Sequence, residues 1–118
     1  MRTMEFYDEN RVVVVTLPTE LQRRLALTEA DMEDISALGG VVEGTDCSIT
    51  MKETRDGAWK VSLRTGARVN ATRACARLGG GGHRAASGCV IEHAALSDAK
   101  RMILSAVQEA INEENGAN

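Results

Sequence analysis

TDCSITMKETRDGAWKVSLR, residues 45–64, is the stretch of the chain that decides the fold. In its first half the apolar residues Ile49 and Met51 alternate with polar ones, and this period of two is typical of a strand with one buried face. The pair Asp56-Gly57 predicts a two-residue type I′ turn, because both central positions of that turn need a positive φ. Trp59 to Arg64 then forms the return strand of an antiparallel hairpin.

The return strand has an apolar face and a polar face. Its core-facing residues are Trp59, Val61 and Leu63. Lys60, Ser62 and Arg64 alternate with them and therefore share the opposite face.

Two elements are predicted before the hairpin. The β-branched run Val12 to Val15 predicts a strand covered on both faces, and Pro18 ends it. Thr28 and Asp31 resemble the capping pair of a helix, which we expect from about Glu29 to Leu38, where Gly39-Gly40 stops it.

Three elements are predicted after the hairpin. Asn70 is a suitable N-cap for a helix from Ala71 to Leu78, with Gly79 as the residue that closes it. A strand from Gly88 to Glu92 follows. The last element is a helix, and Glu113 to Asn118 is expected to be a frayed polar tail. The apolar stripe of this last helix, at helical spacing, consists of Ala99, Met102, Ile103, Ala106, Val107, Ala110 and Ile111.

This order of elements predicts one compact α/β domain over residues 1–118, with a mixed β-sheet flanked by helices. A strand covered on both faces needs helices on both sides of the sheet, whereas the hairpin is antiparallel. A chain of 118 residues that is 43% hydrophobic has enough apolar material for one core.

Composition narrows the classes of function. A net charge of -3 and a pI near 5.4 argue against a protein that coats long stretches of nucleic acid, although a small anionic ligand remains possible. Aromatic residues make up only 3% of the chain, too few for a stacking platform. No apolar stretch is long enough to cross a bilayer, so we expect a soluble cytoplasmic protein with reduced, partly buried cysteines.

The run Gly79-Gly80-Gly81-Gly82-His83 is the strongest functional signal. Four consecutive glycines cost much backbone freedom, and they allow N–H groups to converge on an anion such as phosphate. His83 and Arg84 add hydrogen-bond donors. We therefore predict an anion-binding loop, with a flexible connector as the alternative.

The strand WKVSLR, the capped helix and the stretch GGGGHRAASG at residues 79–88 together resemble the DHHA1 domain. This domain is the C-terminal lobe of DHH-family phosphoesterases, which include bifunctional oligoribonucleases and phosphoadenosine-phosphate phosphatases, cyclic-di-AMP phosphodiesterases and RecJ exonucleases. The resemblance covers nearly the whole chain. The family commonly has Ser at the position of Thr65 and Ala at the position of Ser87, and we expect both changes to be tolerated.

The resemblance implies a substrate-binding role for the glycine segment. Gly80, Gly81, Gly82 and His83 would hold a phosphate or sugar. Arg64 would contact a terminal phosphate or a base, which suits a planar guanidinium. Arg84 either contributes to this site or points to solvent.

The resemblance also implies that the catalytic chemistry lies outside this chain. In the family, Asp and His ligands in an N-terminal DHH domain hold manganese ions that activate water. No Asp-His-His sequence occurs here, so we assign no catalytic residue and no metal ligand, and expect a trimmed lobe or fragment that binds without cleaving. The alternative of a zinc site uses Cys75, His83, Cys89 and His93, whose spacings match no zinc pattern.

Three functions are therefore compared. The first is the substrate lobe of a phosphoesterase acting on short oligoribonucleotides, phosphorylated adenosine nucleotides or cyclic dinucleotides. The second is a non-catalytic RNA-binding module like the related domain of alanyl-tRNA synthetase, which the acidic pI and scarce aromatics disfavour. The third is a structural or oligomerising domain whose glycines serve only packing.

Overall fold

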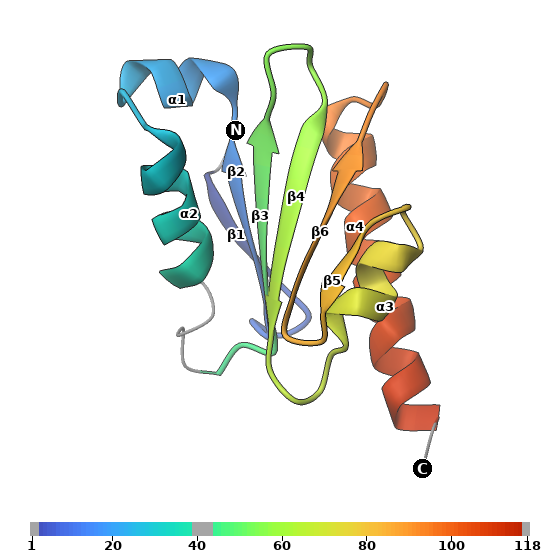
Figure 1. Ribbon diagram of the computed structural model, residues 1–118. Coiled ribbons are helices and arrows are strands. Elements are labelled where there is room, and N and C mark those ends of the chain that lie inside the picture. The colour runs from blue at the N-terminus through green and yellow to red at the C-terminus, as the bar shows by residue number, and fades with distance from the viewer. Residues whose placement is uncertain (1–2, 39–43, 117–118) are drawn as a thin grey trace.

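A six-stranded mixed sheet with helices on both faces is seen in the computed structural model, which describes residues 3–38 and 44–116 (Figure 1). This confirms the predicted α/β fold. The strands are β1 Met4–Tyr7, β2 Val12–Leu17, β3 Cys47–Glu53, β4 Trp59–Thr65, β5 Gly81–His83 and β6 Ala86–Ile91. The helices are α1 Thr19–Arg24, α2 Glu29–Leu38, α3 Ala71–Ala76 and α4 Leu96–Gly116.

The strand order across the sheet is β1-β2-β3-β4-β6-β5. Only β2 and β3 pair in parallel among the described strands, because the segment with α1 and α2 connects them. Among the described residues, no helix has the length and apolar character needed to cross a membrane.

β2 is buried on both faces, as its β-branched sequence predicts, and it ends before Pro18. Val12 and Val14 face the larger core, which α3 and α4 cover. Val15 and Leu17 face a smaller cluster with Met32 of α2. The two faces of the sheet are therefore covered by different pairs of helices.

The predicted capping pair of α2 is confirmed. The Thr28 N–H donates to a carboxylate oxygen of Asp31 at 2.9 Å, and the Asp31 N–H donates to the Thr28 hydroxyl at 3.1 Å. The hydrogen bond from the Thr28 N–H, and to a smaller extent one with the Thr28 hydroxyl, hold the pKa of Asp31 below the ordinary value of an aspartate. α2 spans the predicted residues Glu29–Leu38, whereas the predicted stop at Gly39-Gly40 lies outside the described residues.

The faces of β4 are confirmed, since the apolar residues are buried while Lys60 is exposed. The predicted two-residue turn is wrong, because only Gly57, and not Asp56, has a positive φ. The loop has three residues, with a left-handed glycine last, which is a common hairpin connection. Thr54 favours it: its hydroxyl is 2.8 Å from the Asp56 carboxylate, and its N–H donates to the Ala58 carbonyl.

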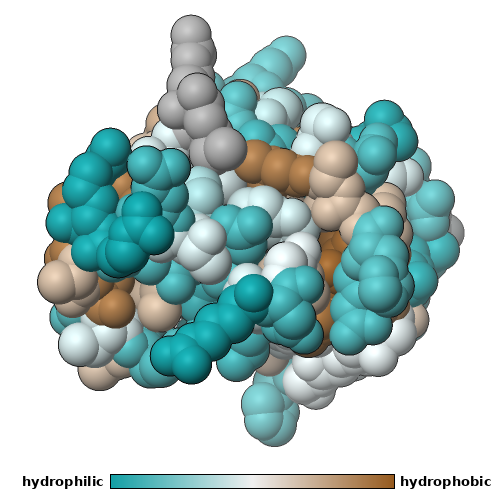
Figure 2. Space-filling model, turned by 90° about the horizontal axis from the view of Figure 1, so that it is seen from above, coloured by the Kyte–Doolittle hydropathy of each residue, from teal (hydrophilic) through white to brown (hydrophobic). Residues whose placement is uncertain are grey.

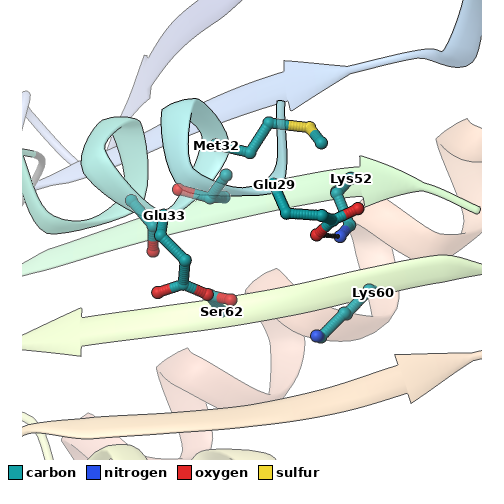
Figure 3. A pocket seen from close by; sticks show the side chains of 8 residues that line it. Glu29, Met32, Glu33, Lys52, Lys60 and Ser62 are labelled. Carbon is teal, nitrogen blue, oxygen red and sulfur yellow. Dashed lines mark hydrogen bonds and ion pairs between the residues drawn. The ribbon is translucent and has the colours of Figure 1, made fainter. Parts of the chain in front are cut away.

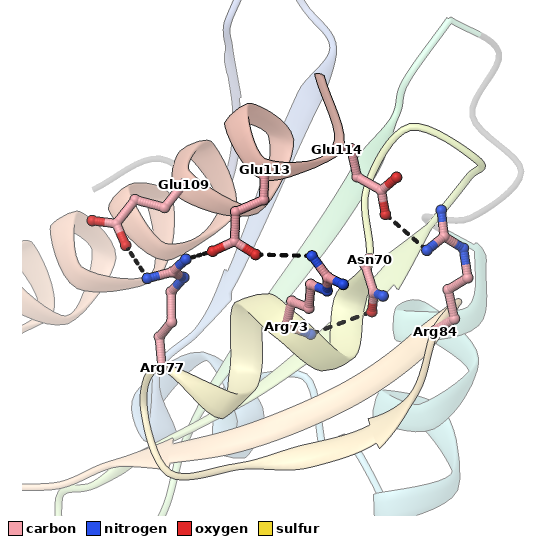
Figure 4. Close-up of polar contacts among 7 residues, drawn as sticks. All are labelled: Asn70, Arg73, Arg77, Arg84, Glu109, Glu113 and Glu114. Carbon is pink, nitrogen blue, oxygen red and sulfur yellow. Dashed lines mark hydrogen bonds and ion pairs between the residues drawn. The ribbon is translucent and has the colours of Figure 1, made fainter. Parts of the chain in front are cut away.

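The ends of the chain differ from the prediction. β1 and α1 were not predicted. α4 continues to Gly116, so residues 113–116 are helical rather than frayed. Arg73 and Arg77 of α3 form ion pairs with Glu113 and thereby hold this last part of α4 (Figure 4).

The apolar stripe of α4 is buried as predicted, except for Met102, which is 39% exposed.

Seen from above, hydrophilic and intermediate residues cover most of the surface, and hydrophobic residues form small separate patches (Figure 2).

Candidate nucleotide-binding site

The glycine run does not form the predicted loop. Gly81–His83 is a strand, β5, which pairs antiparallel with β6 at the edge of the sheet. β6 starts at Ala86 and ends at Ile91, rather than running from Gly88 to Glu92. Glycine has no side chain to reveal a strand pattern, yet its backbone groups pair like those of any residue.

The segment before β5 is fixed by the end of α3. Asn70 caps this helix as predicted, because its side chain accepts the Arg73 N–H. α3 ends at Ala76 rather than at Leu78, and a turn follows. Gly79 closes the helix as predicted: it has a φ of 82° and donates to the Ala76 carbonyl, while Gly80 donates to the Cys75 carbonyl. This pair of bonds is that of a Schellman motif.

Packing or backbone conformation requires glycine at three positions of the run. Gly79 has the left-handed φ just described. A Cβ on Gly80 would lie 2.1 Å from the Gly88 carbonyl oxygen. Gly82 has a φ of 146°, and a Cβ there would lie 2.7 Å from the Ala86 carbonyl oxygen.

Gly81 differs from its neighbours. A Cβ at this position would meet nothing within 4 Å, and its φ is not in the positive range. The fold therefore accounts for the other glycines but does not require one at position 81.

The register of the sheet brings predicted site residues onto one face. Arg64 pairs with Ala86, and Ala86 pairs with His83. Directly opposed residues of antiparallel strands project from the same face, so Arg64 and His83 stand at the two ends of one row, about 10 Å apart between Cα atoms.

A second row runs beside the first. Ser62 pairs with Gly88, and Gly88 pairs with Gly81. The floor between Arg64 and His83 therefore consists of small residues. A hollow of about 230 Å³ lies over it, lined by Glu33, Ser62, Leu63, Arg64, Gly81, Gly82, Ala86, Ser87 and Gly88.

Arg64 is the cation of this hollow. Its side chain is 37% exposed, and among the described residues its ion-pair partner is Glu33 of α2, with a carboxylate oxygen 4.0 Å from the guanidinium. This is a loose ion pair, so the Arg64 guanidinium can exchange it for a ligand at little cost. Sequence reasoning did not find Glu33, because only the packing of α2 on the sheet brings it to Arg64.

Arg84 lies apart from the other predicted site residues. It donates one hydrogen bond to Glu114 of α4 at 2.8 Å and another to the Ala67 carbonyl at 3.0 Å, as Figure 4 shows for Glu114. The hydrogen bond from Arg84 holds the pKa of Glu114 below its ordinary value. In this structure Arg84 ties the β5–β6 turn to the end of α4.

The residues of the zinc alternative are not gathered. Cys75 and Cys89 are buried in the core that α3 and α4 cover, whereas His83 is exposed on the other face of the sheet. The third cysteine, Cys47, is also buried, and burial raises its pKa to about 12. Cys47 is thus a protonated core residue at neutral pH.

The sequence of the chain matches a known domain family. The model of the DHHA1 domain family matches residues 26–113. The chain belongs to this family. The resemblance seen in the sequence is therefore confirmed, and the domain is one that occurs in DHH-family phosphoesterases.

The chain is also similar in sequence to an individual protein. It is 32% identical over 111 residues to the bifunctional oligoribonuclease and PAP phosphatase NrnA of Thermus thermophilus. The match covers 94% of this chain and 32% of that protein. The chain thus spans about a third of the length of this relative.

Two solved structures share the fold. An exopolyphosphatase-related protein from Bacteroides fragilis has a TM-score of 0.81 at 21% identity, over 95% of this chain and 33% of that one. The pGpG-specific phosphodiesterase PggH from Vibrio cholerae has a TM-score of 0.59 at 22% identity, over 94% of this chain and 36% of that one.

Proposed function

We propose that this chain is the nucleotide-binding lobe of a DHH-family phosphoesterase, and that the face carrying Arg64, Gly81 and His83 holds the substrate. Among the substrates that the family implies, short oligoribonucleotides and phosphorylated adenosine nucleotides are favoured, because the sequence relative is named for both activities. The observation that carries the proposal is the register, which sets Arg64 and His83 at opposite ends of a row over small residues.

The chemistry of this face suits a phosphate with an attached sugar or base. The Arg64 guanidinium can donate to two phosphate oxygens at once, which a lysine cannot do. His83 can donate a further hydrogen bond from its ring. Because Gly81, Gly88 and Ala86 carry little or no side chain, a flat group can lie close to the backbone.

In this proposal the residues that hydrolyse the substrate belong to another domain. Among the described residues, no group of three or more His, Cys, Asp or Glu side chains is placed to hold a metal ion. We propose that a DHH domain supplies the catalytic residues, with the manganese that the family resemblance implies. The isolated chain is expected to bind nucleotide without cleaving it.

Gly81→Ala is the variant that tests the site. Apart from its two neighbours in the chain, no described atom lies within 4 Å of a Cβ at this position, so a loss of affinity in this variant indicates a ligand lying on the floor. Isothermal titration with a 5′-phosphorylated diadenylate should show an affinity about tenfold lower, which corresponds to about 1.4 kcal/mol. Gly66→Ala is the matched control, because a Cβ there also meets nothing within 4 Å and Gly66 does not line the hollow.

Backbone amide shifts then distinguish the alternative functions. We expect the 5′-phosphorylated diadenylate or adenosine 3′,5′-bisphosphate to shift amides of Arg64 and residues 81–83. If Gly81→Ala binds as tightly as the unmodified chain, the proposed floor is wrong. If tRNA alone causes shifts, the chain is an RNA-binding module instead, and if no nucleotide does, the glycines serve only packing.

A further inference from the structure

We propose that Lys60 binds a second anionic group of the same ligand, so that the site favours a linear dinucleotide or longer strand over a mononucleotide. This inference rests on the proposed function and assigns a further binding residue to it. It depends on the position of Lys60, on the absence of a carboxylate within ion-pair distance of it among the described residues, and on the shape of the surface beside it.

Lys60 lies on the same polar face as Arg64. Residues two apart on a strand are about 6.7 Å apart, so Lys60, Ser62 and Arg64 form a line about 13 Å long. Lys60 is exposed, whereas Ser62 and Arg64 are half-buried. The two long cationic side chains can thus reach a ligand from the two ends of this line, with the Ser62 hydroxyl between them.

Glu29 offsets the Lys60 charge only in part: the hydrogen bond and charge of Lys52 lower the pKa of Glu29 most, and the charge of Lys60 adds to this from farther away. Lys60 lies directly opposite Lys52 of β3, and like charges in opposed positions destabilise a sheet. Glu29 of α2 pairs with Lys52 at 2.6 Å. No carboxylate oxygen in the described part of the chain lies within ion-pair distance of the Lys60 ammonium.

Figure 3 shows this arrangement from close by. Glu29 reaches from α2 to Lys52, while the Lys60 side chain extends away from that pair. An anion beside Lys60 would therefore relieve the repulsion between the two lysines without displacing Glu29. With Arg64 of the adjoining hollow included, this surface holds three cations and the two carboxylates Glu29 and Glu33.

The surface beside Lys60 is continuous with the Arg64 hollow. A narrow cleft between α2 and strands β3 and β4 is lined by Lys60, and it shares Ser62 and Glu33 with that hollow. The buried hydroxyls of Ser36 and Thr50, which have no hydrogen-bond partner within residues 3–38 and 44–116, also line the cleft.

The size of the cleft decides where the second group lies. Its volume of about 20 Å³ has room for about one water molecule, so a nucleoside cannot enter it. The second group must therefore lie over the mouth of the cleft, along β4, where the Lys60 ammonium is exposed.

The test compares two ligands and two variants of the 118-residue chain. Dissociation constants are measured for a 5′-phosphorylated diadenylate and for AMP, from about 50 to about 200 mM salt. Lys60→Gln removes the proposed contact. Arg55→Gln is the matched control, because it removes the same charge from an exposed residue of the β3–β4 loop that lines neither the cleft nor the hollow.

Lys60→Gln is expected to weaken diadenylate binding about fivefold to tenfold and to leave AMP binding within about twofold. The slope of log affinity against log salt for diadenylate should fall by about 0.7, the value for one phosphate contact with a single strand. Equal losses for both ligands, no loss for either, or the same loss in Arg55→Gln would overturn the inference.

Failure of this inference differs from failure of the proposed function. If the unmodified chain binds both ligands and Arg64→Ala weakens both, but Lys60→Gln has no effect, only the role of Lys60 is wrong. If the unmodified chain binds neither ligand, the proposed function is wrong and the role of Lys60 is wrong with it.

Discussion

Gly80→Ala and Gly81→Ala should have opposite effects on stability, although the two glycines are adjacent. A Cβ on Gly80 would lie 2.1 Å from the Gly88 carbonyl oxygen and 2.6 Å from the Cβ of Cys89. A Cβ has no rotamer with which to avoid a contact, and Gly88 and Cys89 lie in the paired strand β6. The start of β5 must therefore move away from β6.

The size of the effect follows from these contacts. Overpacking of this kind costs about 1–3 kcal/mol, and loss of the hydrogen bond from Gly80 to Cys75 adds about 1 kcal/mol. For a chain of this size, 1 kcal/mol shifts the unfolding temperature by about 4 °C, so Gly80→Ala should lower it by about 8–16 °C. Gly81→Ala should instead raise stability by about 0.4–1 kcal/mol, because alanine restricts the unfolded chain.

Thermal unfolding followed by circular dichroism measures both changes, and a urea titration gives the free energies. Because small domains are stable by about 5–15 kcal/mol, both variants should remain folded at room temperature. If Gly81→Ala unfolds as early as Gly80→Ala, the register of β5 on β6 is wrong. If Gly80→Ala unfolds like the unmodified chain, packing does not require glycine at position 80.

Three further variants test the site and the helix ends. Arg64→Ala should weaken nucleotide binding about tenfold to a hundredfold with little change in unfolding temperature, because the carboxylate of its ion-pair partner Glu33 is 4.0 Å away; unchanged affinity in a calorimetric titration would remove Arg64 from the site. Arg84→Ala should leave nucleotide affinity unchanged but reduce the helicity of the end of α4, since Arg84 bonds Glu114; lost affinity would place Arg84 in the site. Asp31→Asn should destabilise the chain at neutral pH. The folded-state pKa of Asp31 is lowered, so its stabilising effect is complete above the unfolded pKa of about 3.9 and is lost as the pH falls through the folded pKa. Urea titrations should therefore show the difference between Asp31→Asn and the unmodified chain shrinking below about pH 4, and a difference independent of pH would contradict the capping role.

Local rules in the sequence predicted much of the fold. Thr28 and Asp31 cap α2 through atoms three residues apart, and Asn70 caps α3 over the same distance. The two faces of β4 follow from alternation alone. In each case the residues that decide the structure are close neighbours in the chain, so a short window of sequence contains the information.

The errors arose where distant residues decide the structure. β5 forms because β6 supplies its hydrogen-bond partners, and glycines show no alternation that could reveal it. The role of Arg84 was left open for the same reason, since its partner Glu114 is thirty residues away. Likewise, β1 was missed because its mixed sequence has only β2 to pair with, and its side chains are not fully buried.

The register explains why the candidate site was predicted only in part. Arg64 was recognisable in the sequence as a polar residue on a strand, and the glycine run as a conformationally unusual segment. Their placement in neighbouring rows requires the pairing of β4, β6 and β5, which spans more than twenty residues. Glu33 enters from α2, which packs against β3 and β4, and no sequence pattern connects it to Arg64.

The two outermost strands of the sheet bear on how the protein behaves at high concentration. An exposed sheet edge offers unpaired N–H and carbonyl groups to strands of other molecules, and long flat edges promote aggregation. Here β1 has four residues and β5 has three, two of them glycine. Glycine is also a poor strand former. The edge beside the proposed site therefore offers few backbone groups to a strand of another molecule, which disfavours aggregation by addition of strands to the sheet.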